Sequence, residues 1–212
     1  MRIQVFSDSV CPWCYIGKRH LEQALTQADI GPADIQWRAF QLNPDLPPEG
    51  RDRREYLDAK FGGPDAVRTI HARIEAAGRG AGIEFRFDRI TRSPNTFNAH
   101  RLIRLADTQQ RAAAMVEALF RAYFVEGHDI GDTDTLAELA RASSLAVDLR
   151  AWLAGDGQRA EVLEDLQTAR RLGIGGVPFF ILEERYALSG AQPVAVFVQA
   201  LQAARQKSRA VH

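Results

Sequence analysis

The sequence predicts an α/β fold that carries a large helical insertion. Strand and helix patterns alternate near both ends of the chain, whereas the middle of the chain is mostly helical. We therefore expect one α/β domain formed by residues 1–44 and 173–212. A helical insertion domain at residues 45–172 is expected to interrupt it.

The N-terminal unit has the pattern strand, helix, strand. Residues 3–6 form a short apolar run, which is typical of a buried strand. From Pro12 onward, apolar side chains recur every three or four residues, which predicts a helix. Proline suits a first helical turn because its missing N–H would have no partner there. Residues 35–40 alternate between apolar and polar side chains, which predicts a second strand.

The middle of the chain follows a proline-rich connector at residues 43–50. Residues 83–87 alternate between apolar and polar side chains and predict a short extended piece. The charges at residues 51–55 indicate a solvated helix start rather than a binding patch. The helices expected here span residues 52–61, 64–77, 96–107, 111–124, 133–142, 148–153 and 158–172.

The C-terminal unit begins with the glycine-rich residues 173–176, which lead to Val177 and Pro178. Glycines allow the kind of tight turn in which a cis X–Pro bond occurs, although an ordinary turn before a strand fits this segment equally well. The apolar run at residues 179–182 predicts a central strand, and residues 186–188 its hairpin partner. A last helix is expected from residue 193 to about residue 206.

The composition excludes some classes of partner. Lys plus Arg and Asp plus Glu each number 27, so the formal net charge is zero. Such a balance gives no broad field to attract nucleic acid or an anionic membrane surface. No apolar stretch has the length of a membrane span, and the first residues lack the apolar core of a secretory signal. We expect a cytoplasmic monomer or homodimer without nucleic-acid or membrane partners.

The two cysteines of the chain, Cys11 and Cys14, lie where the first strand gives way to the first helix. Unpaired N–H groups and the helix dipole at such a position favour a thiolate at Cys11. Cys14 comes one helical turn later, where it could attack a mixed disulfide formed at Cys11. The motif therefore predicts thiol–disulfide exchange.

Three other interpretations of the cysteine pair stay open. A structural disulfide would close a very short loop, gain little stability and be reduced in the cytoplasm. Two inert core cysteines would need no further partner. A zinc site would need ligands from scattered histidines, and no paired spacing is present, so no metal is expected. Those histidines are His20, His71, His100, His128 and His212.

Taken together, these segments resemble the DsbA family of the thioredoxin superfamily, and within it the FrnE-like branch, a cytoplasmic group. The resemblance runs over nearly the whole chain and implies a thioredoxin fold with a large helical insertion. It is carried, in order, by CPWCYIGKRHLEQAL, LNPDLPP, SPNTFNAHRLI, LFRAYFVEGHDIGD, GIGGVPFFI and YALSGAQP.

The resemblance also implies roles for single residues. Cys11 would be the nucleophile of a protein-disulfide oxidoreductase or isomerase, and Cys14 the resolving thiol. Pro178 would be a cis-proline beside the pair, and Val177 would offer its backbone to an extended substrate. Pro12 and Trp13 complete the expected substrate-binding set. The better-known DsbA proteins have Pro-His between the cysteines, so the redox potential does not follow from the resemblance.

An alternative family resemblance points to glutathione chemistry. The same region is similar to kappa-class glutathione transferases and 2-hydroxychromene-2-carboxylate isomerases, which typically have serine where Cys11 stands. A glutathione-dependent transferase or isomerase is thus one alternative, and a redox-sensing, chaperone-like binder is another. Ser189 is a candidate for holding the glutathione carboxylate, with helix capping as its simpler role. No tightly bound cofactor is expected, but glutathione could serve as reductant or ligand.

Two polar residues near these motifs have less specific roles. Asp8 could move protons at the thiols, or its side chain could close a local Asx turn. His100 lies on an expected helix, where a lone histidine is more often packed than catalytic. We therefore leave His100 out of the predicted site. The substrates expected for the whole site are disulfides and thiols of proteins or small molecules.

Overall fold

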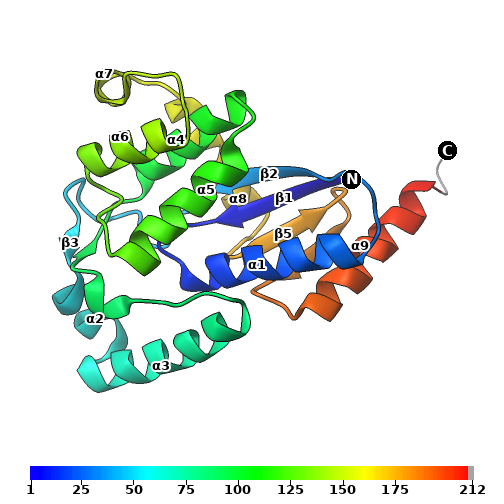
Figure 1. Ribbon diagram of the computed structural model, residues 1–212, viewed down its shortest axis with the longest axis horizontal. Coiled ribbons are helices and arrows are strands. Elements are labelled where there is room, and N and C mark those ends of the chain that lie inside the picture. The colour runs from blue at the N-terminus through cyan, green and yellow to red at the C-terminus, as the bar shows by residue number, and fades with distance from the viewer. Residues whose placement is uncertain (210–212) are drawn as a thin grey trace.

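The computed structural model describes residues 1–209, and a four-stranded mixed sheet lies at its centre (Figure 1). The strand order is β2-β1-β5-β6. Strand β1 (Arg2–Ser7) is parallel to β2 (Asp34–Ala39) and antiparallel to β5 (Phe179–Leu182). Strand β5 also pairs with β6 (Tyr186–Ser189) as a hairpin. The predicted α/β fold, in which both ends of the chain share one sheet, is confirmed.

Helices cover both faces of this sheet (Figure 1). Helices α1 (Pro12–Gln27) and α9 (Val194–Arg209) pack side by side on one face, and α8 (Arg159–Arg171) covers the other. Successive side chains of a strand point to opposite faces of the sheet, so β1 contacts helices on both sides. Val5 joins the core beneath α1, whereas its neighbour Phe6 packs toward α8.

The insertion is helical, as predicted. In Figure 1 its first two helices lie below the sheet, and the helices of its middle part lie at the upper left. Before α8 the helices are α2 (Arg53–Phe61), α3 (Pro64–Gly80), α4 (Phe97–Thr108), α5 (Ala112–Arg121), α6 (Thr133–Ala142) and α7 (Leu149–Ala154).

Three details of the insertion differ from the prediction. The helix expected at 111–124 ends at Arg121 and continues as a π-helical turn, Ala122–Glu126. The extended piece expected at residues 83–87 pairs with no strand and runs into a 3₁₀ turn at Phe87–Arg89; the alternation reflects burial of one side. A two-stranded ribbon of β3 (Arg51–Asp52) and β4 (Arg92–Ser93), which the sequence did not predict, joins the start of α2 to the segment before α4.

A half-buried polar cluster fixes α1 against α5. The Lys18 ammonium lies 2.7 Å from Glu117 Oε2, and the Tyr15 hydroxyl donates to Glu117 Oε1 at 2.8 Å. Burial and the neighbouring carboxylate raise the pKa of Tyr15 to about 12, so its hydroxyl keeps its proton at neutral pH. These contacts set the position of α1 relative to the insertion.

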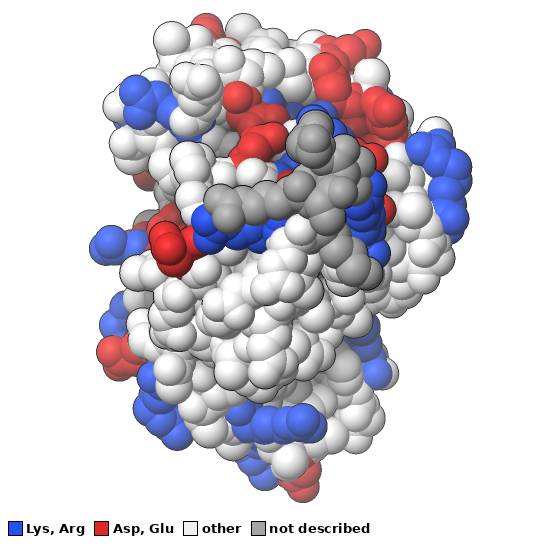
Figure 2. Space-filling model, turned by 90° about the vertical axis from the view of Figure 1, so that its right-hand side faces the viewer, with Lys and Arg blue, Asp and Glu red and all other residues white. Residues whose placement is uncertain are grey.

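The face of the molecule in Figure 2 carries side chains of both charge signs. Figure 2 shows basic and acidic side chains scattered over one face, with uncharged residues across its middle. None of the helices within residues 1–209 has the apolar length needed to span a bilayer. The division into residues 1–44 with 173–212 and residues 45–172 stays a prediction, and its last three residues lie outside the described part.

Candidate active site

Cys11 occupies the N-cap position of α1, with an extended backbone (φ −95°, ψ 110°). Its N–H donates to the Asp8 carbonyl at 3.0 Å, and its own carbonyl accepts from the Cys14 N–H at 3.0 Å. Pro12 follows as the first helical residue, as its missing N–H favours. This local geometry places the Cys11 sulfur at the positive end of the helix dipole.

Cys14 lies behind Cys11, in the core. Its exposed fraction is 1%, against 4% for Cys11. Burial raises the pKa of the Cys14 thiol well above its usual value, and the neighbouring Cys11 sulfur raises it further, while hydrogen bonds from Ser7 and Asp8 act in the opposite direction. Cys14 is therefore a protonated thiol at neutral pH until a base or a leaving thiolate accepts its proton.

The Val177–Pro178 peptide bond is cis, as the glycine-rich approach allowed and the family resemblance implied. The Cys11 thiol lies 3.6 Å from the Val177 carbonyl oxygen, to which it can donate. Pro178 is buried against α1, where Gly17 makes the close approach possible. A Cβ atom at Gly17 would lie only 2.9 Å from Pro178 Cγ.

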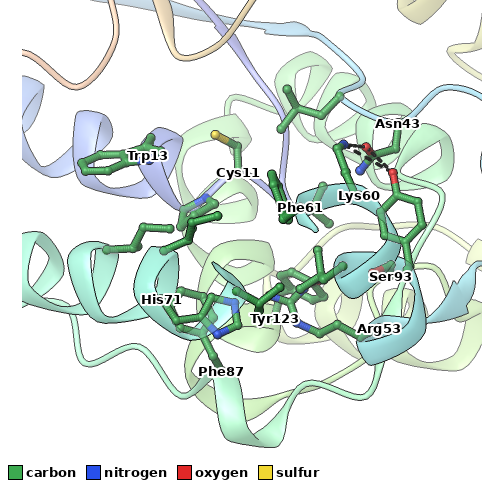
Figure 3. Close-up of a pocket in the computed structure, with 18 of the residues that line it drawn as sticks. Cys11, Trp13, Asn43, Arg53, Lys60, Phe61, His71, Phe87, Ser93 and Tyr123 are labelled. Atoms are coloured by element: carbon green, nitrogen blue, oxygen red, sulfur yellow. Dashed lines mark hydrogen bonds between the residues drawn. The ribbon is translucent and has the colours of Figure 1, made fainter. Parts of the chain in front are cut away.

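A cavity of about 340 Å³ opens beside the Cys11 sulfur (Figure 3). Its surface is mostly apolar. We call the part of the lining that comes from the start of α1 and from the residue before Pro178 the core wall; it consists of Val10, Cys11, Pro12, Trp13 and Val177. We call the side that comes from the insertion the insertion wall; its polar and aromatic members are Arg53, Tyr56, Lys60, Phe61, His71, Phe87, Ser93 and Tyr123.

Stacked rings hold the insertion wall together. The His71 and Phe87 rings stack with centroids 4.2 Å apart and planes 17° from parallel. Arg53 donates from Nη1 to the Tyr123 hydroxyl at 2.7 Å. Its guanidinium carbon lies 5.6 Å from the Tyr123 ring centroid and 5.8 Å from that of Phe87. Residues from four separate segments thus form one surface facing Cys11.

The electrostatics of the insertion wall are dominated by cations. Burial, and then the charge of Arg53, lower the pKa of His71 to about 4, so that its ring is neutral at pH 7. Burial raises the pKa of Tyr123 to about 12, so that its phenol is neutral as well. At pH 7, the charged side chains of the wall are Arg53 and Lys60.

Asp8 and His100 form a buried polar pair. Asp8 Oδ2 accepts from the Leu42 N–H at 2.7 Å, and Oδ1 lies 3.5 Å from His100 Nε2. His100 Nε2 also lies 3.0 Å from the Phe40 carbonyl oxygen. His100 is packed, as expected, but the Asx turn considered for Asp8 is wrong. Its carboxylate binds a distant backbone N–H, and only its backbone carbonyl takes part in the local turn.

The structure brings most of the predicted site residues together. Cys11, Pro12, Trp13 and Val177 line one cavity. Trp13 is half-buried there, with the Arg73 guanidinium carbon 6.0 Å from its ring centroid.

Ser189 lies apart from this group, exposed at the end of β6 and outside the cavity lining. It does not cap α9 either, because that helix begins at Val194 and the Ser189 carbonyl instead accepts from the Gln192 side chain. Within residues 1–209, no cluster of three or more His, Cys, Asp or Glu side chains has the geometry of a metal site.

Several residues of the cavity had no signal in the sequence. Arg53 was interpreted as part of a solvated helix start, but it is half-buried and lines the cavity. His71, Phe87 and Tyr123 come from three separate segments, so no motif could relate them. The alternating apolar residues at 83–87 predicted a short extended piece, which did not indicate that Phe87 lines the cavity.

Comparison with models of known protein families identifies the family to which this chain belongs. The family model described as a DSBA-like thioredoxin domain matches residues 2–202. The chain belongs to the DsbA-like thioredoxin family. Membership of the FrnE-like branch stays a prediction.

Individual relatives of this DsbA-like chain agree with that assignment. The structure of the probable DsbA oxidoreductase SCO1869 from Streptomyces coelicolor is 34% identical, with a TM-score of 0.88 over 96% of this chain and 89% of that one. The uncharacterised protein YwbO of Bacillus subtilis is 27% identical over 98% of each chain. The cytosolic disulfide reductase DsbM of Pseudomonas aeruginosa, solved with GSH, is 22% identical and shares the fold, with a TM-score of 0.64 over 99% and 98%.

Proposed function

We propose that this protein is a cytoplasmic thiol–disulfide oxidoreductase that reacts through Cys11 and resolves through Cys14. The observation that supports this proposal most directly is the arrangement of the two thiols at the start of α1. Cys11 borders the cavity, and Cys14 is buried behind it with a raised pKa. Such an arrangement separates an attacking thiol, which meets substrate, from a resolving thiol, which does not.

The reduced protein would act in two balanced steps. The Cys11 thiolate attacks one sulfur of a substrate disulfide, forms a mixed disulfide and releases the first substrate thiolate. Cys14 then attacks the Cys11 sulfur, the second substrate thiolate leaves, and the Cys14 proton passes to it. The substrate gains two electrons and the protein gains a Cys11–Cys14 disulfide. The reverse sequence oxidises a substrate dithiol, and release after partial exchange would isomerise a disulfide.

Substrate binding in this proposal uses the core wall. The Val177 carbonyl faces the reacting sulfur, and Pro12 and Trp13 flank it. Glutathione is proposed as the reductant that regenerates the thiols, with no tightly bound cofactor. Disulfides of proteins or of small molecules are the proposed substrates. In the cytoplasm, thiol buffers would keep the cysteine pair reduced and ready to attack.

The shape of the cavity favours one alternative function. A mostly apolar space beside Cys11 would also suit a glutathione-dependent transferase or isomerase acting on a small aromatic molecule. In such an enzyme the bound glutathione supplies the thiol, so activity should survive the loss of Cys14. A redox-sensing, chaperone-like binder would keep its binding activity when both cysteines are changed.

Cysteine variants distinguish these functions. We expect Cys11→Ser to reduce an aryl disulfide no faster than the double variant Cys11→Ser/Cys14→Ser, measured in a single turnover with pre-reduced protein. Cys14→Ser should release one thiolate and accumulate a one-to-one mixed disulfide that dithiothreitol removes, visible by intact mass. Full activity of Cys11→Ser would refute the proposal.

A further inference from the structure

Arg53 is a cation that has no anionic partner in the described part of the chain. Among residues 1–209 it forms no salt bridge, and its polar side-chain contact is the hydrogen bond to the neutral Tyr123 hydroxyl. Its other contacts are the faces of the Tyr123 and Phe87 rings. A guanidinium has five N–H donors, so most of those of Arg53 have no acceptor among the described residues. Arg54, the next residue, is by contrast 87% exposed and lies 4.0 Å from the Asp58 carboxylate.

The other described residues that line the cavity also include a cation and no acidic side chain. Lys60, at the rim, pairs with the neutral oxygens of Asn43 and Tyr56. No Asp or Glu belongs to the cavity lining within the described chain. The whole protein has a formal net charge of zero, so the excess of positive charge here is local. Arg53 is a half-buried cation in an apolar wall, which is costly unless an anion compensates it, and no acidic side chain of the described residues lines this cavity.

The size and surface of the cavity limit what that anion can belong to. A volume of about 340 Å³ is near the lower end for small-molecule sites, which typically range over about 300–1,000 Å³. The stacked rings of His71 and Phe87 offer a flat apolar surface. An aromatic or similarly flat molecule fits these walls, and a carboxylate on it matches the planar donor geometry of arginine.

Building on the proposed exchange reaction, we propose that the cavity selects low-molecular-weight disulfides with a flat apolar body and a carboxylate, which Arg53 binds while the disulfide meets Cys11. The insertion wall thus defines the substrate class, and the core wall carries out the exchange. Arg53 touches the substrate but takes no part in electron transfer. The electron balance remains that of the two exchange steps, with two aryl thiolates released.

Two matched disulfides test the selection. Bis(3-carboxyphenyl) disulfide carries the anion, and bis(3-carbamoylphenyl) disulfide has the same shape without charge. Single-turnover rate constants with pre-reduced protein would be divided by the rates of the same disulfides with dithiothreitol, which removes their intrinsic difference in reactivity. We expect the unmodified protein to prefer the carboxylate about tenfold, the size of one charge-assisted contact. Equal normalised rates would overturn the inference.

Variants at neighbouring positions assign the preference to one side chain. Arg53→Gln should lower the carboxylate-to-amide ratio about tenfold, to near one, and Arg53→Lys should retain part of it. Arg54→Gln is the matched control on the same helix and should leave the ratio unchanged, because that side chain is exposed. An unchanged ratio in a folded Arg53→Gln protein would overturn the assignment.

A binding measurement separates this inference from the exchange reaction itself. The thioether bis(3-carboxyphenyl) sulfide cannot exchange, and its affinity for Cys11→Ser can be measured by calorimetry. We expect its Kd to rise about tenfold in Cys11→Ser/Arg53→Gln. That result would support the inference even if exchange were absent and the proposed function were wrong. Exchange at Cys11 without any preference for the carboxylate would overturn the inference and leave the proposed function standing.

Discussion

The two walls of the cavity differ in how they are built. The core wall comes mainly from two short segments, the start of α1 and the residues before β5, and its reactive groups are neighbours in sequence. The insertion wall collects Arg53, His71, Phe87 and Tyr123 from α2, α3, a 3₁₀ turn and a π-helical turn. One wall is a local motif, and the other exists only after tertiary folding.

This difference suggests a division of labour. A local motif at a helix start can be kept intact while the insertion around it changes, so the same thiol chemistry can serve different substrates. In the account proposed above, the insertion wall, whose cations form no salt bridge within the described residues, determines which molecules reach Cys11. If this is correct, changes to the core wall should affect all substrates alike. Changes to the insertion wall should affect the ratio between substrates.

The largest effect is expected from Gly17→Ala, at the contact between α1 and Pro178 that supports the core wall. The new Cβ would lie 2.9 Å from Pro178 Cγ and 3.2 Å from Phe180 Cζ, so α1 or the cis-proline loop must move. We expect a loss of about 1–3 kcal/mol in the free energy of unfolding, measured with urea, because overpacking outweighs the gain in helix propensity. Exchange should slow equally for the carboxylate and amide disulfides.

Gly80→Ala provides the matched control for Gly17→Ala. Gly80 is also helical, and a Cβ there meets no atom within 4 Å. This variant should be neutral or slightly stabilising, by up to about 1 kcal/mol. If Gly17→Ala behaved like Gly80→Ala in both stability and rate, the close contact between α1 and Pro178 would not matter for the core wall.

A smaller effect is expected from the insertion wall, through His71. The unfolded chain protonates this histidine near pH 6.5, but the folded protein does so only near pH 4. Between these values the unfolded state binds more protons, so the folded state loses stability as the pH falls from 6.5 to 4. We expect this to amount to about 1–2 kcal/mol, because the ring is half-buried and solvent screens part of the effect.

Urea unfolding of His71→Gln at a series of pH values tests this prediction. The carboxylates titrate in both proteins, so the difference between them isolates the histidine. Stability of the unmodified protein should fall more steeply between pH 6.5 and pH 4 than that of the variant. Arg53→Gln should reduce this extra slope, because Arg53 is the second cause of the shift after burial. Parallel curves for His71→Gln and the unmodified protein would contradict the packing described for the insertion wall.

The sequence predicted the parts of this molecule whose signals are local. The strand–helix–strand start, the terminal hairpin and the cysteine pair are each encoded within a few neighbouring residues, and the structure has them where expected. The helices of the insertion followed from the periodicity of apolar residues, with ends shifted by a few positions. The cis bond at Pro178 needed the family resemblance in addition to the glycine-rich turn.

The failures came from contacts that join distant segments. Asp8 looked like a turn residue, because nothing local shows that its carboxylate binds the Leu42 N–H, thirty-four residues away. Arg53 looked solvated, because its aromatic neighbours come from distant parts of the chain. The π-helical turn that carries Tyr123 continues an unbroken apolar stripe, so its sequence gives no sign of the irregularity. Ser189 resembled a helix cap, but α9 starts five residues later.

The most direct test of exchange at Cys11 is a redox titration. The protein would be equilibrated in buffers whose ratio of reduced to oxidised glutathione sets a series of redox potentials. The fraction of protein with a Cys11–Cys14 disulfide would then be measured by thiol alkylation and intact mass. We predict one two-electron transition between the dithiol and a Cys11–Cys14 disulfide, within the range of about −270 to −120 mV spanned by thioredoxin-fold oxidoreductases. If no such disulfide formed at any poise, the oxidoreductase proposal would be wrong and the glutathione-dependent alternative would replace it.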